Sequence, residues 1–341
     1  MLQLDYIRGI TMKKFTKLLT ISTLALSLIG CGSSSTLSTE NASSKNNTVT
    51  VESYSISDDG TTWEPIMATF DKVPERVLCN NQGAAELMLR LGLGDKIAGV
   101  SAVFGDPAED VAEEFSKLNV LSTSYISKEV ALSVNPDCII GRGDLFINGD
   151  YGVGTVTDLN NAGISTYITH VGEDKATYDS FLADIKNLGK IFNVEDRAQE
   201  LVEIYNNKIN TLEETYGNNN LTMAEIATVE NGVPTLSSPA KEYIQNEAFE
   251  MIGLKNAFAD FTGSEISVET LIESNPDVLI LFDYAGGPNM DEMIEGLYNN
   301  ASLQDITAIK EKRVYALDFN EIYGGSGDIY DAMGKLAETI Y

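Results

Sequence analysis

Histidine, cysteine and tryptophan are scarce in this chain of 341 residues, which contains one, three and one of them. His170 is the only histidine, which disfavours a bare zinc or manganese site, because such sites need several histidines and carboxylates that converge. The sole histidine lies far from any Gly-x-Ser-x-Gly turn, so no nucleophile–base pair is indicated. The sequence also lacks a Walker-type glycine loop and a cluster of cysteines and histidines. We therefore do not expect an enzyme, a set of catalytic residues or a resident cofactor.

Basic residues are also few. Lysine and arginine number 23 against 51 aspartates and glutamates, which gives a formal net charge of −28. A chain with this excess of negative charge repels the phosphate backbone of nucleic acids and anionic lipid headgroups. Nucleic acid is therefore not expected as a partner. The net charge by itself does not identify a ligand.

A long apolar run lies near the N-terminus. LLTISTLALSLIG (18–30) follows the cationic residues 12–17 and is too short to span a bilayer comfortably, so residues 1–30 are predicted to be a signal peptide that starts at Met1 or Met12. Its end, LIGC (28–31), resembles the lipobox of bacterial lipoproteins. The resemblance implies that Cys31 is lipidated and anchors an extracytoplasmic protein to the cell membrane. A secretory signal with a chance cysteine is the alternative.

Apolar residues are rare in residues 31–50, where Ser, Thr, Asn and Gly dominate, and this segment is predicted to be a flexible tether. Two cysteines remain beyond it, Cys79 and Cys138. Each lies in an apolar run, which favours two buried free thiols over a disulfide.

Strand and helix patterns alternate along the rest of the chain, which is typical of an α/β fold with mostly parallel sheets. An antiparallel hairpin around Asp-Asp-Gly (58–60) comes first and carries Trp63. Strand patterns are absent between 178 and 216, where two apolar stripes predict two helices, the second over about 195–216. We predict two Rossmann-like lobes joined by a long rigid helix: an N-terminal lobe over 51–178, a helical linker over 179–220 and a C-terminal lobe over 221–341.

Within the two lobes the patterns predict individual elements. Helices are expected over 127–134, from 143 through 159, and over 243–254, 268–274 and 329–341. Strands are expected over 76–79, 137–140, 165–169, 224–229, 278–282 and 313–317.

An internal repeat marks corresponding positions in the two predicted lobes. SKEVALSVNPD (127–137) and SVETLIESNPD (267–277) share a first Ser, a Glu two positions later and a closing Asn-Pro-Asp. Glu129 and Glu269 each lie seven residues before the proline. In both copies the pattern predicts a short helix, a turn at which proline stops the helix, and a buried strand.

Four features in this order, behind a lipobox, resemble the class III periplasmic-type substrate-binding proteins of ABC importers. They are PERVLCNNQGAAELMLRLGLGDKIAGV (74–100), the two repeat units, LGKIFNVEDRAQEL (188–201) and LQDITAIKEKRVYALD (303–318). The resemblance runs from about residue 74 to the C-terminus. The family carries ferric siderophores, haem and cobalamin, so the resemblance implies two lobes with a ligand cleft between them and a small hinge motion.

The resemblance also implies a role for the repeated glutamates. In this family each lobe presents one glutamate, seven residues before the proline of such a unit, to arginines of the membrane permease. Glu129 and Glu269 occupy those positions. A two-lobed protein that docks on a roughly two-fold permease needs one matching anion per lobe, and carboxylate–guanidinium contacts are oriented. The alternative is that each glutamate only favours the first turn of its helix.

Loops that follow the parallel strands are the candidates for the cleft, because ligands in open α/β sheets bind beyond the carboxyl ends of the strands. Arg142 would offer paired donors to the oxygens of a siderophore, or it forms a surface pair with Asp144. Asn80 and Gln82 either face the ligand or satisfy a turn. The aromatic candidates, each of which is otherwise a core residue, are Phe104, Phe146, Tyr243, Tyr284 and Tyr323.

His170 directly follows a predicted strand, where a structural role is the main expectation and an axial haem ligand the alternative. Together these observations predict a lipid-anchored protein that captures an iron chelate, a ferric siderophore, and delivers it to the permease dimer of an ABC importer. Haem or cobalamin is the alternative ligand. A surface adhesion or signalling lipoprotein without transport is the alternative of a different class.

Overall fold

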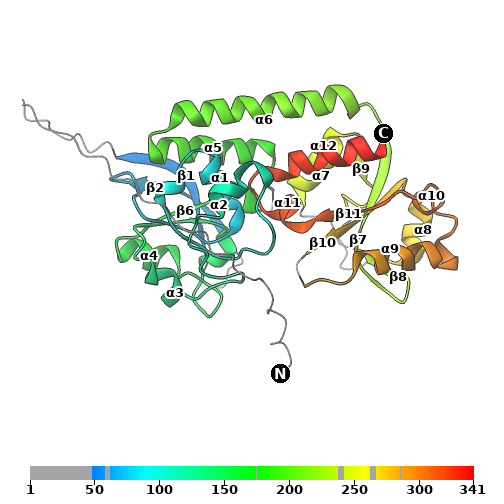
Figure 1. The fold of residues 1–341 in the computed structure, drawn as a ribbon, viewed down its shortest axis with the longest axis horizontal. Helices are drawn as coiled ribbons and strands as arrows, with labels where there is room; N and C mark the ends of the chain where they lie inside the picture. Colours follow the sequence, from blue (N-terminus) through cyan, green and yellow to red (C-terminus); the bar gives the residue numbers. More distant parts are fainter. Residues whose placement is uncertain (1–47, 58–61, 174, 237–241, 262–265, 285) are drawn as a thin grey trace, which may run out of the picture. The chain divides into compact units, whose positions relative to one another are not determined.

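The computed structural model describes residues 48–341, except 58–61, 174, 237–241, 262–265 and 285. The predicted α/β fold with parallel central sheets is confirmed (Figure 1). Cys31, the signal peptide, most of the tether and the turn at 58–60 lie outside the described residues. The tether prediction extends slightly too far, since the first strand begins at Val49.

The first sheet has four parallel strands in the order β4-β3-β5-β6. They are β3 (Val77–Cys79), β4 (Ile97–Val100), β5 (Cys138–Gly141) and β6 (Ser165–Ile168). The helices of this part are α1 (Gln82–Arg90), α2 (Ala112–Phe115), α3 (Lys128–Ser133) and α4 (Val156–Asn161). The predicted antiparallel hairpin is present as β1 (Val49–Ile56) and β2 (Trp63–Phe70). We call the part built on this sheet the first lobe.

The helix predicted from 143 through 159 is wrong. The structure has one 3-10 turn, Gly143–Leu145, and then irregular backbone until α4 begins at Val156. Gly149 and Gly154 have φ values of +130° and +105°, which a right-handed helix does not accept. The glycines therefore interrupt the helical pattern and leave a loop next to the end of β5.

The second sheet has five strands, in the order β11-β10-β7-β8, with β9 paired to β7. They are β7 (Leu221–Glu230), β8 (Val233–Leu236), β9 (Leu254–Asn256), β10 (Val278–Asp283) and β11 (Val314–Asp318). The helices here are α7 (Tyr243–Met251), α8 (Val268–Ser274), α9 (Met290–Asn299), α10 (Thr307–Lys310), α11 (Phe319–Tyr323) and α12 (Asp328–Ile340). The strands β8 and β9 and the helices α9, α10 and α11 have no counterpart in the sequence prediction. We call this part the second lobe.

The two sheets share one connectivity. In the first lobe β3 has β4 on one side and β5, then β6, on the other. In the second lobe β7 has β9 on one side and β10, then β11, on the other, and all of these pairs are parallel. Of the described strands in the second sheet, only β8, which pairs antiparallel with β7, is additional. The chain therefore builds the same four-stranded arrangement twice.

The repeated sequence occupies equivalent places in these two arrangements. In each lobe a short helix, α3 or α8, precedes the third strand, β5 or β10. Asn135 and Asn275 each adopt φ +47°, the left-handed conformation that ends a helix. The Asp137 Oδ1 atom accepts from Arg76 N–H at 2.9 Å, and Asp277 Oδ2 accepts from Thr222 N–H at 2.9 Å. The Asn-Pro-Asp triplet thus ties the residue before β5 to the residue before β3, and the residue before β10 to the second residue of β7.

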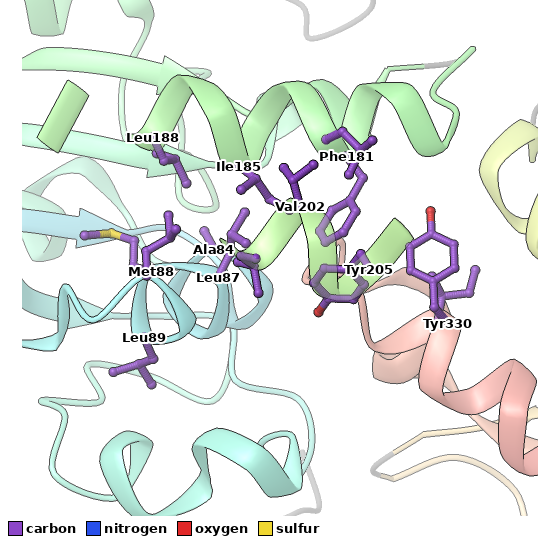
Figure 2. Close-up of a cluster of buried hydrophobic side chains, with 14 of the residues drawn as sticks. Ala84, Leu87, Met88, Leu89, Phe181, Ile185, Leu188, Val202, Tyr205 and Tyr330 are labelled. Carbon is purple, nitrogen blue, oxygen red and sulfur yellow. The ribbon is translucent and has the colours of Figure 1, made fainter. Parts of the chain in front are cut away.

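Two helices with no strand between them join the lobes, as predicted. They are α5 (Tyr178–Phe192) and α6 (Glu195–Tyr216), and Asn193 ends α5 in the left-handed conformation. Figure 2 shows Phe181, Tyr205 and Tyr330 gathered from α5, α6 and α12. The rings of Phe181 and Tyr205 lie 4.8 Å apart at 89°, and those of Phe181 and Tyr330 lie 5.7 Å apart. Residues of both lobes therefore share one continuous hydrophobic core, a feature that restrains their relative movement.

Residues 46–341 form one compact unit by their contacts. The domain boundaries predicted near 178 and 220 stay a prediction. Within the part of the chain that the structure describes, none of the helices combines the length and the apolar character needed to cross a membrane.

Candidate ligand-binding cleft

Two adjacent cavities lie at the carboxyl ends of the parallel strands, with volumes of about 220 Å³ and 200 Å³. The first takes lining residues from the ends of β5 and β6, from the start of α7 and from α11. The second takes them from the start of α1, from the segment after β4 and from α11. Both are lined by Asn81, Arg142, Phe319, Tyr323 and Gly324. We refer to the two cavities together as the cleft.

The cleft lies where the strand order of the first sheet changes direction. After β3 the chain continues to β4, which lies on one side of β3. After β5, on the other side of β3, it continues away from β3 to β6, so the loops at the ends of β3 and β5 diverge. The backbone N–H of Arg142 donates to Asn80 Oδ1 at 2.8 Å, and Asn80 Nδ2 donates to the Arg142 carbonyl at 3.0 Å. Asn80 is 1% exposed. Of its two predicted roles, the structure shows the turn-stabilising one.

Arg142 reaches both cavities, and its guanidinium is also paired. Its Nε lies 2.7 Å from Asp144 Oδ1, with the two side chains 45% and 44% exposed. The surface pair that the sequence left as an alternative is therefore present at the mouth of the cleft. Water screens such an exposed pair, which contributes under about 1 kcal/mol to stability. The neighbouring carboxylate nevertheless offsets part of the positive charge that Arg142 offers to a ligand.

Aromatic side chains form much of the wall that the second lobe provides. Phe319 and Tyr323 stack with ring centroids 4.6 Å apart, and Tyr284 meets Phe319 edge-on at 6.2 Å. Tyr243 is 47% exposed at the start of α7 and lines the first cavity. Tyr284, also 47% exposed, contacts this wall but is absent from the lining of either cavity. Phe319 was not predicted as a site residue, although it directly follows β11 and lies on the same short helix as Tyr323.

Phe104 and Gln82 lie in the second cavity. Phe104 packs edge-on against Tyr125 with centroids 5.3 Å apart, and both rings line it. Gln82 is 5% exposed, and its Nε2 donates to Glu86 Oε1 at 2.9 Å and to the Asp106 carbonyl at 3.0 Å. The amide is thus rigidly held at the start of α1.

Phe146 does not face the cleft, which corrects the prediction for this residue. Its side chain is fully buried in a core cluster with Leu78, Ile139 and Ile168. The Gly143–Leu145 turn directs the chain away from Arg142 so that the ring covers one face of the first sheet. Sequence spacing alone did not distinguish this core ring from Phe319.

The lone histidine, His170, belongs to a hydrogen-bond network with buried side chains. His170 Nδ1 lies 2.8 Å from Asp184 Oδ1, which also accepts from the Tyr167 hydroxyl at 2.7 Å. Burial of the ring opposes protonation, but the hydrogen bond to Asp184 and the negative charges of Asp184, Glu52 and Glu173 together outweigh it and raise the pKa of His170. Asp184 is completely buried on α5 and also accepts from Val171 N–H. The network therefore fixes the segment 170–172, part of which lines the first cavity.

Glycines let the two lobes approach closely behind the cleft. A side chain at Gly83, on α1, would overlap the carbonyl oxygen of Gly324 in the second lobe. Asn81 Nδ2 donates to the same carbonyl at 3.3 Å. Nearby, Arg90 of α1 donates to the Ser326 carbonyl at 2.7 Å and pairs with Asp328 of α12. These contacts hold the start of α1 against the end of α11, and the end of α1 against the start of α12.

Acidic side chains that the sequence analysis did not single out line the first cavity. They are Glu173, after β6, and Glu242, before α7. Behind Glu242 lies Glu225 of β7, which is 2% exposed. Burial, and then the charge of Glu242, raise the pKa of Glu225 well above its ordinary value. The signal in the sequence was a glutamate inside an otherwise apolar strand.

The repeated glutamates lie away from the cleft lining. Glu129 and Glu269 are both exposed in the first turns of α3 and α8. A hydrogen bond from Ser127 lowers the pKa of Glu129. The side chain of Ser267 instead accepts from Thr270 N–H and caps α8.

Among the described residues there is no group of three or more His, Cys, Asp or Glu side chains placed to hold a metal ion. Cys79 and Cys138 are buried free thiols, as predicted. Burial raises the pKa of both thiols, which keeps them protonated.

Comparisons with known proteins agree with this architecture. A family model described as periplasmic binding protein matches residues 77–321. The chain is 22% identical over 322 residues to YvrC of Bacillus subtilis, an uncharacterized ABC transporter substrate-binding lipoprotein, covering 93% of this chain and 94% of that one. It is 22% identical over 337 residues to the petrobactin-binding protein YclQ of Bacillus subtilis, covering 96% and 98%. A crystal structure of a periplasmic binding protein from Veillonella parvula superposes with a TM-score of 0.74 at 26% identity, covering 86% and 98%.

Proposed function

The chain belongs to the periplasmic binding protein family, and on this basis we propose that it captures a ferric siderophore outside the cytoplasm and delivers it to an ABC importer. The observation that carries the proposal is the cleft, which takes its lining from loops of both lobes at the carboxyl ends of parallel strands. The protein is a binder and not an enzyme. The relative YclQ is named as a petrobactin-binding protein, which supports the choice of a siderophore as the ligand class.

The aromatic wall supports a large, flat-sided ligand. Tyr243, Phe319 and Tyr323 line the first cavity on the side of the second lobe. Rigid aromatic side chains bury much area at a low cost in conformational entropy. The shared core of the two lobes keeps these rings placed relative to Arg142 before a ligand arrives.

Binding is tested by titration of the full chain with ferric siderophores of the hydroxamate and catecholate types, and with haemin and cobalamin. Trp63 is a built-in reporter, because its ring lies against Gly143 and Gly172, and Gly172 lines the first cavity. We expect quenching of its fluorescence with a Kd below about 1 μM, which corresponds to roughly −8 kcal/mol. Failure of every iron chelate to bind in this range would contradict the proposal.

We propose that Glu129 and Glu269 dock the protein onto arginines of the permease. Support comes from their equivalent places, since each is exposed in the first turn of the helix before the third strand of its sheet. Two matching anions on equivalent helices are what a roughly two-fold partner requires. The predicted lipid anchor at Cys31 would hold the protein at the same membrane.

Charge reversal of both glutamates tests docking. The double variant Glu129→Lys, Glu269→Lys should lose uptake in cells while soluble ligand affinity stays within about twofold of the parent. The matched control is Glu200→Lys, Glu214→Lys, which makes the same charge change at exposed positions on α6. Uptake that survives reversal at Glu129 and Glu269, or that is lost equally in the control, would rule out this docking pair.

A further inference from the structure

Several buried polar atoms around the cleft have no hydrogen-bond partner in the protein. Among the described residues these are Asn81 Oδ1, Gln82 Oε1, Glu225 Oε2 and Glu242 Oε2, together with the Tyr330 hydroxyl. Asn81 and Glu242 line the first cavity, and Asn81 and Gln82 line the second. Buried polar atoms in proteins are nearly always paired, so a concentration of unpaired ones at a cavity indicates groups kept for a ligand.

All four of the atoms that belong to amides and carboxyls are oxygens, and the neighbours of the two amides fix their assignment. Gln82 Nε2 donates to Glu86 Oε1 and to the Asp106 carbonyl, so exchanging the two ends of the amide would place oxygen against oxygen. Asn81 Nδ2 donates to the Gly324 carbonyl in the same way. The unpaired atom of each amide is therefore its oxygen, a hydrogen-bond acceptor.

Glu225 and Glu242 form a carboxyl pair at the wall of the first cavity. Glu225 is 2% exposed, and Glu242 lines the cavity with Tyr323. Burial, and then the charges of Glu225 and Glu242, raise the pKa of the Tyr323 hydroxyl, so that group stays neutral. Burial, and then the charge of Glu242, raise the pKa of Glu225 well above its ordinary value, so Glu225 keeps a proton beside Glu242 unless a cation is near. A cationic group of a ligand that reaches Glu242 favours the loss of that proton from Glu225.

The formal charges around the cleft are mainly negative. Among the described residues that line the two cavities, Arg142 is the only basic side chain, against Glu86, Glu173 and Glu242. The guanidinium of Arg142 is in addition paired with Asp144. An anionic ligand would therefore meet a net negative surface, whereas a cationic one would be attracted.

We propose that the cleft selects a chelate that carries a cationic or N–H-rich arm, with Glu242, backed by Glu225, receiving the cation and with Asn81 and Gln82 accepting from N–H groups. This inference rests on the proposed function and adds the charge class of the ligand. It also assigns a binding role to four residues of both lobes. Ferric tricatecholates, which are strongly anionic, are disfavoured by this arrangement.

The test uses two probes that differ by one charge. Ferrioxamine B is a ferric trihydroxamate with a terminal ammonium group, and its N-acetyl derivative is the same chelate without that charge. We expect the full chain to bind the ammonium form at least about tenfold more tightly at low ionic strength, with the preference reduced by salt. Binding of that form should also release a proton, measured by calorimetry in buffers of different ionisation enthalpy.

Single substitutions identify the residue that causes the preference for the ammonium form. Glu242→Gln keeps the size of the side chain and should bring the two probes within about twofold of one another, without proton release. Glu250→Gln makes the same charge change at an exposed position on α7 and should keep the preference. The comparison of the two probes on the parent chain remains decisive if a variant fails to fold.

The outcomes separate the two proposals. Tighter binding of a ferric tricatecholate, or equal binding of the two hydroxamate probes, would overturn the charge class and leave capture of an iron chelate standing. A preference for the ammonium form that Glu250→Gln abolishes and Glu242→Gln retains would overturn the assigned site. Absence of binding by all the chelates would overturn both the charge class and the proposed function.

Discussion

The side chain of Asn80 holds the backbone of Arg142 through a reciprocal pair of hydrogen bonds, of 2.8 Å and 3.0 Å, between the ends of β3 and β5. This pair replaces a backbone bridge at the point where the two strands diverge. It fixes the direction in which Arg142 leaves the sheet. The orientation of a residue at the cleft thus depends on a buried amide that itself is absent from the lining.

Removal of this amide should affect both stability and binding. Asn80→Ala leaves the N–H of Arg142 without its acceptor and removes one of the two donors to the Arg142 carbonyl, which costs about 1–3 kcal/mol. We expect this loss in urea unfolding, together with weaker binding of the chelate. The control Asn220→Ala, at an exposed position, should change the unfolding free energy by under about 0.5 kcal/mol. Equal effects of the two substitutions would contradict the role of Asn80.

Gly141 should be intolerant of any side chain. Its φ of +139° is a conformation that other residues rarely adopt, and an added Cβ would overlap the Oδ1 atoms of Asn80 and Asn81. Gly163→Ala is the matched control, because Gly163 also has a positive φ, of +79°, but has open space where a Cβ would lie.

Both glycine variants introduce backbone strain, and only Gly141→Ala adds the overlap. We expect Gly141→Ala to lose at least about 1 kcal/mol more than Gly163→Ala in the free energy of unfolding. Thermal and urea unfolding of both variants measure the difference. A larger loss at Gly163 would show that the contact with Asn80 is unimportant.

Phe319 and Phe146 should respond to truncation in opposite ways. Phe319 is 36% exposed and lines both cavities, so Phe319→Ala should weaken chelate binding by about tenfold with under about 1 kcal/mol lost in stability. Phe146 is fully buried, so Phe146→Ala should cost about 3–5 kcal/mol of stability. Titration and urea unfolding of both variants check the contrast, which fails if Phe146→Ala proves as stable as the parent.

Glu86 should make stability depend on pH. Burial, followed by the charge of Asp328, raises the pKa of Glu86 to about 7 from an ordinary value of 4.5. Because the pKa is higher in the folded state, the contribution of Glu86 to stability is complete below pH 4.5 and is lost as the pH rises through about 7. Glu86→Gln should therefore flatten the decline of stability between these pH values.

The measurement is urea unfolding at intervals between about pH 4.5 and 8. In the Glu86→Gln variant the amide oxygen of the new side chain retains the acceptor that Gln82 and the Ala108 N–H use. Glu109→Gln, at a nearby exposed position, makes the same charge change and should leave the slope as it is in the parent. An unchanged slope in Glu86→Gln would contradict the shifted pKa.

Local patterns determined much of the fold. The apolar stripe of α6 predicted its bounds of 195–216 closely, and the repeat predicted α3, α8 and the strands that follow them. These features rest on period and on turn chemistry within a few residues, such as the Asn-Pro-Asp that ends both short helices. The irregular loop between Gly143 and Val156 was mistaken for a helix, because apolar spacing there competes with glycines.

The sequence by itself determined the α/β class, the presence of two similar lobes with one repeat unit in each, and the strand ends at which the cleft lies, because periodicity records which side of each element is buried. Only the tertiary structure decided what each side chain meets. It buried Phe146, brought Phe319 to the cleft, and placed Glu225 behind Glu242 across gaps in the sequence. Such contacts join segments that are far apart in the chain, and their energies depend on burial and on neighbouring charge, which no local pattern encodes.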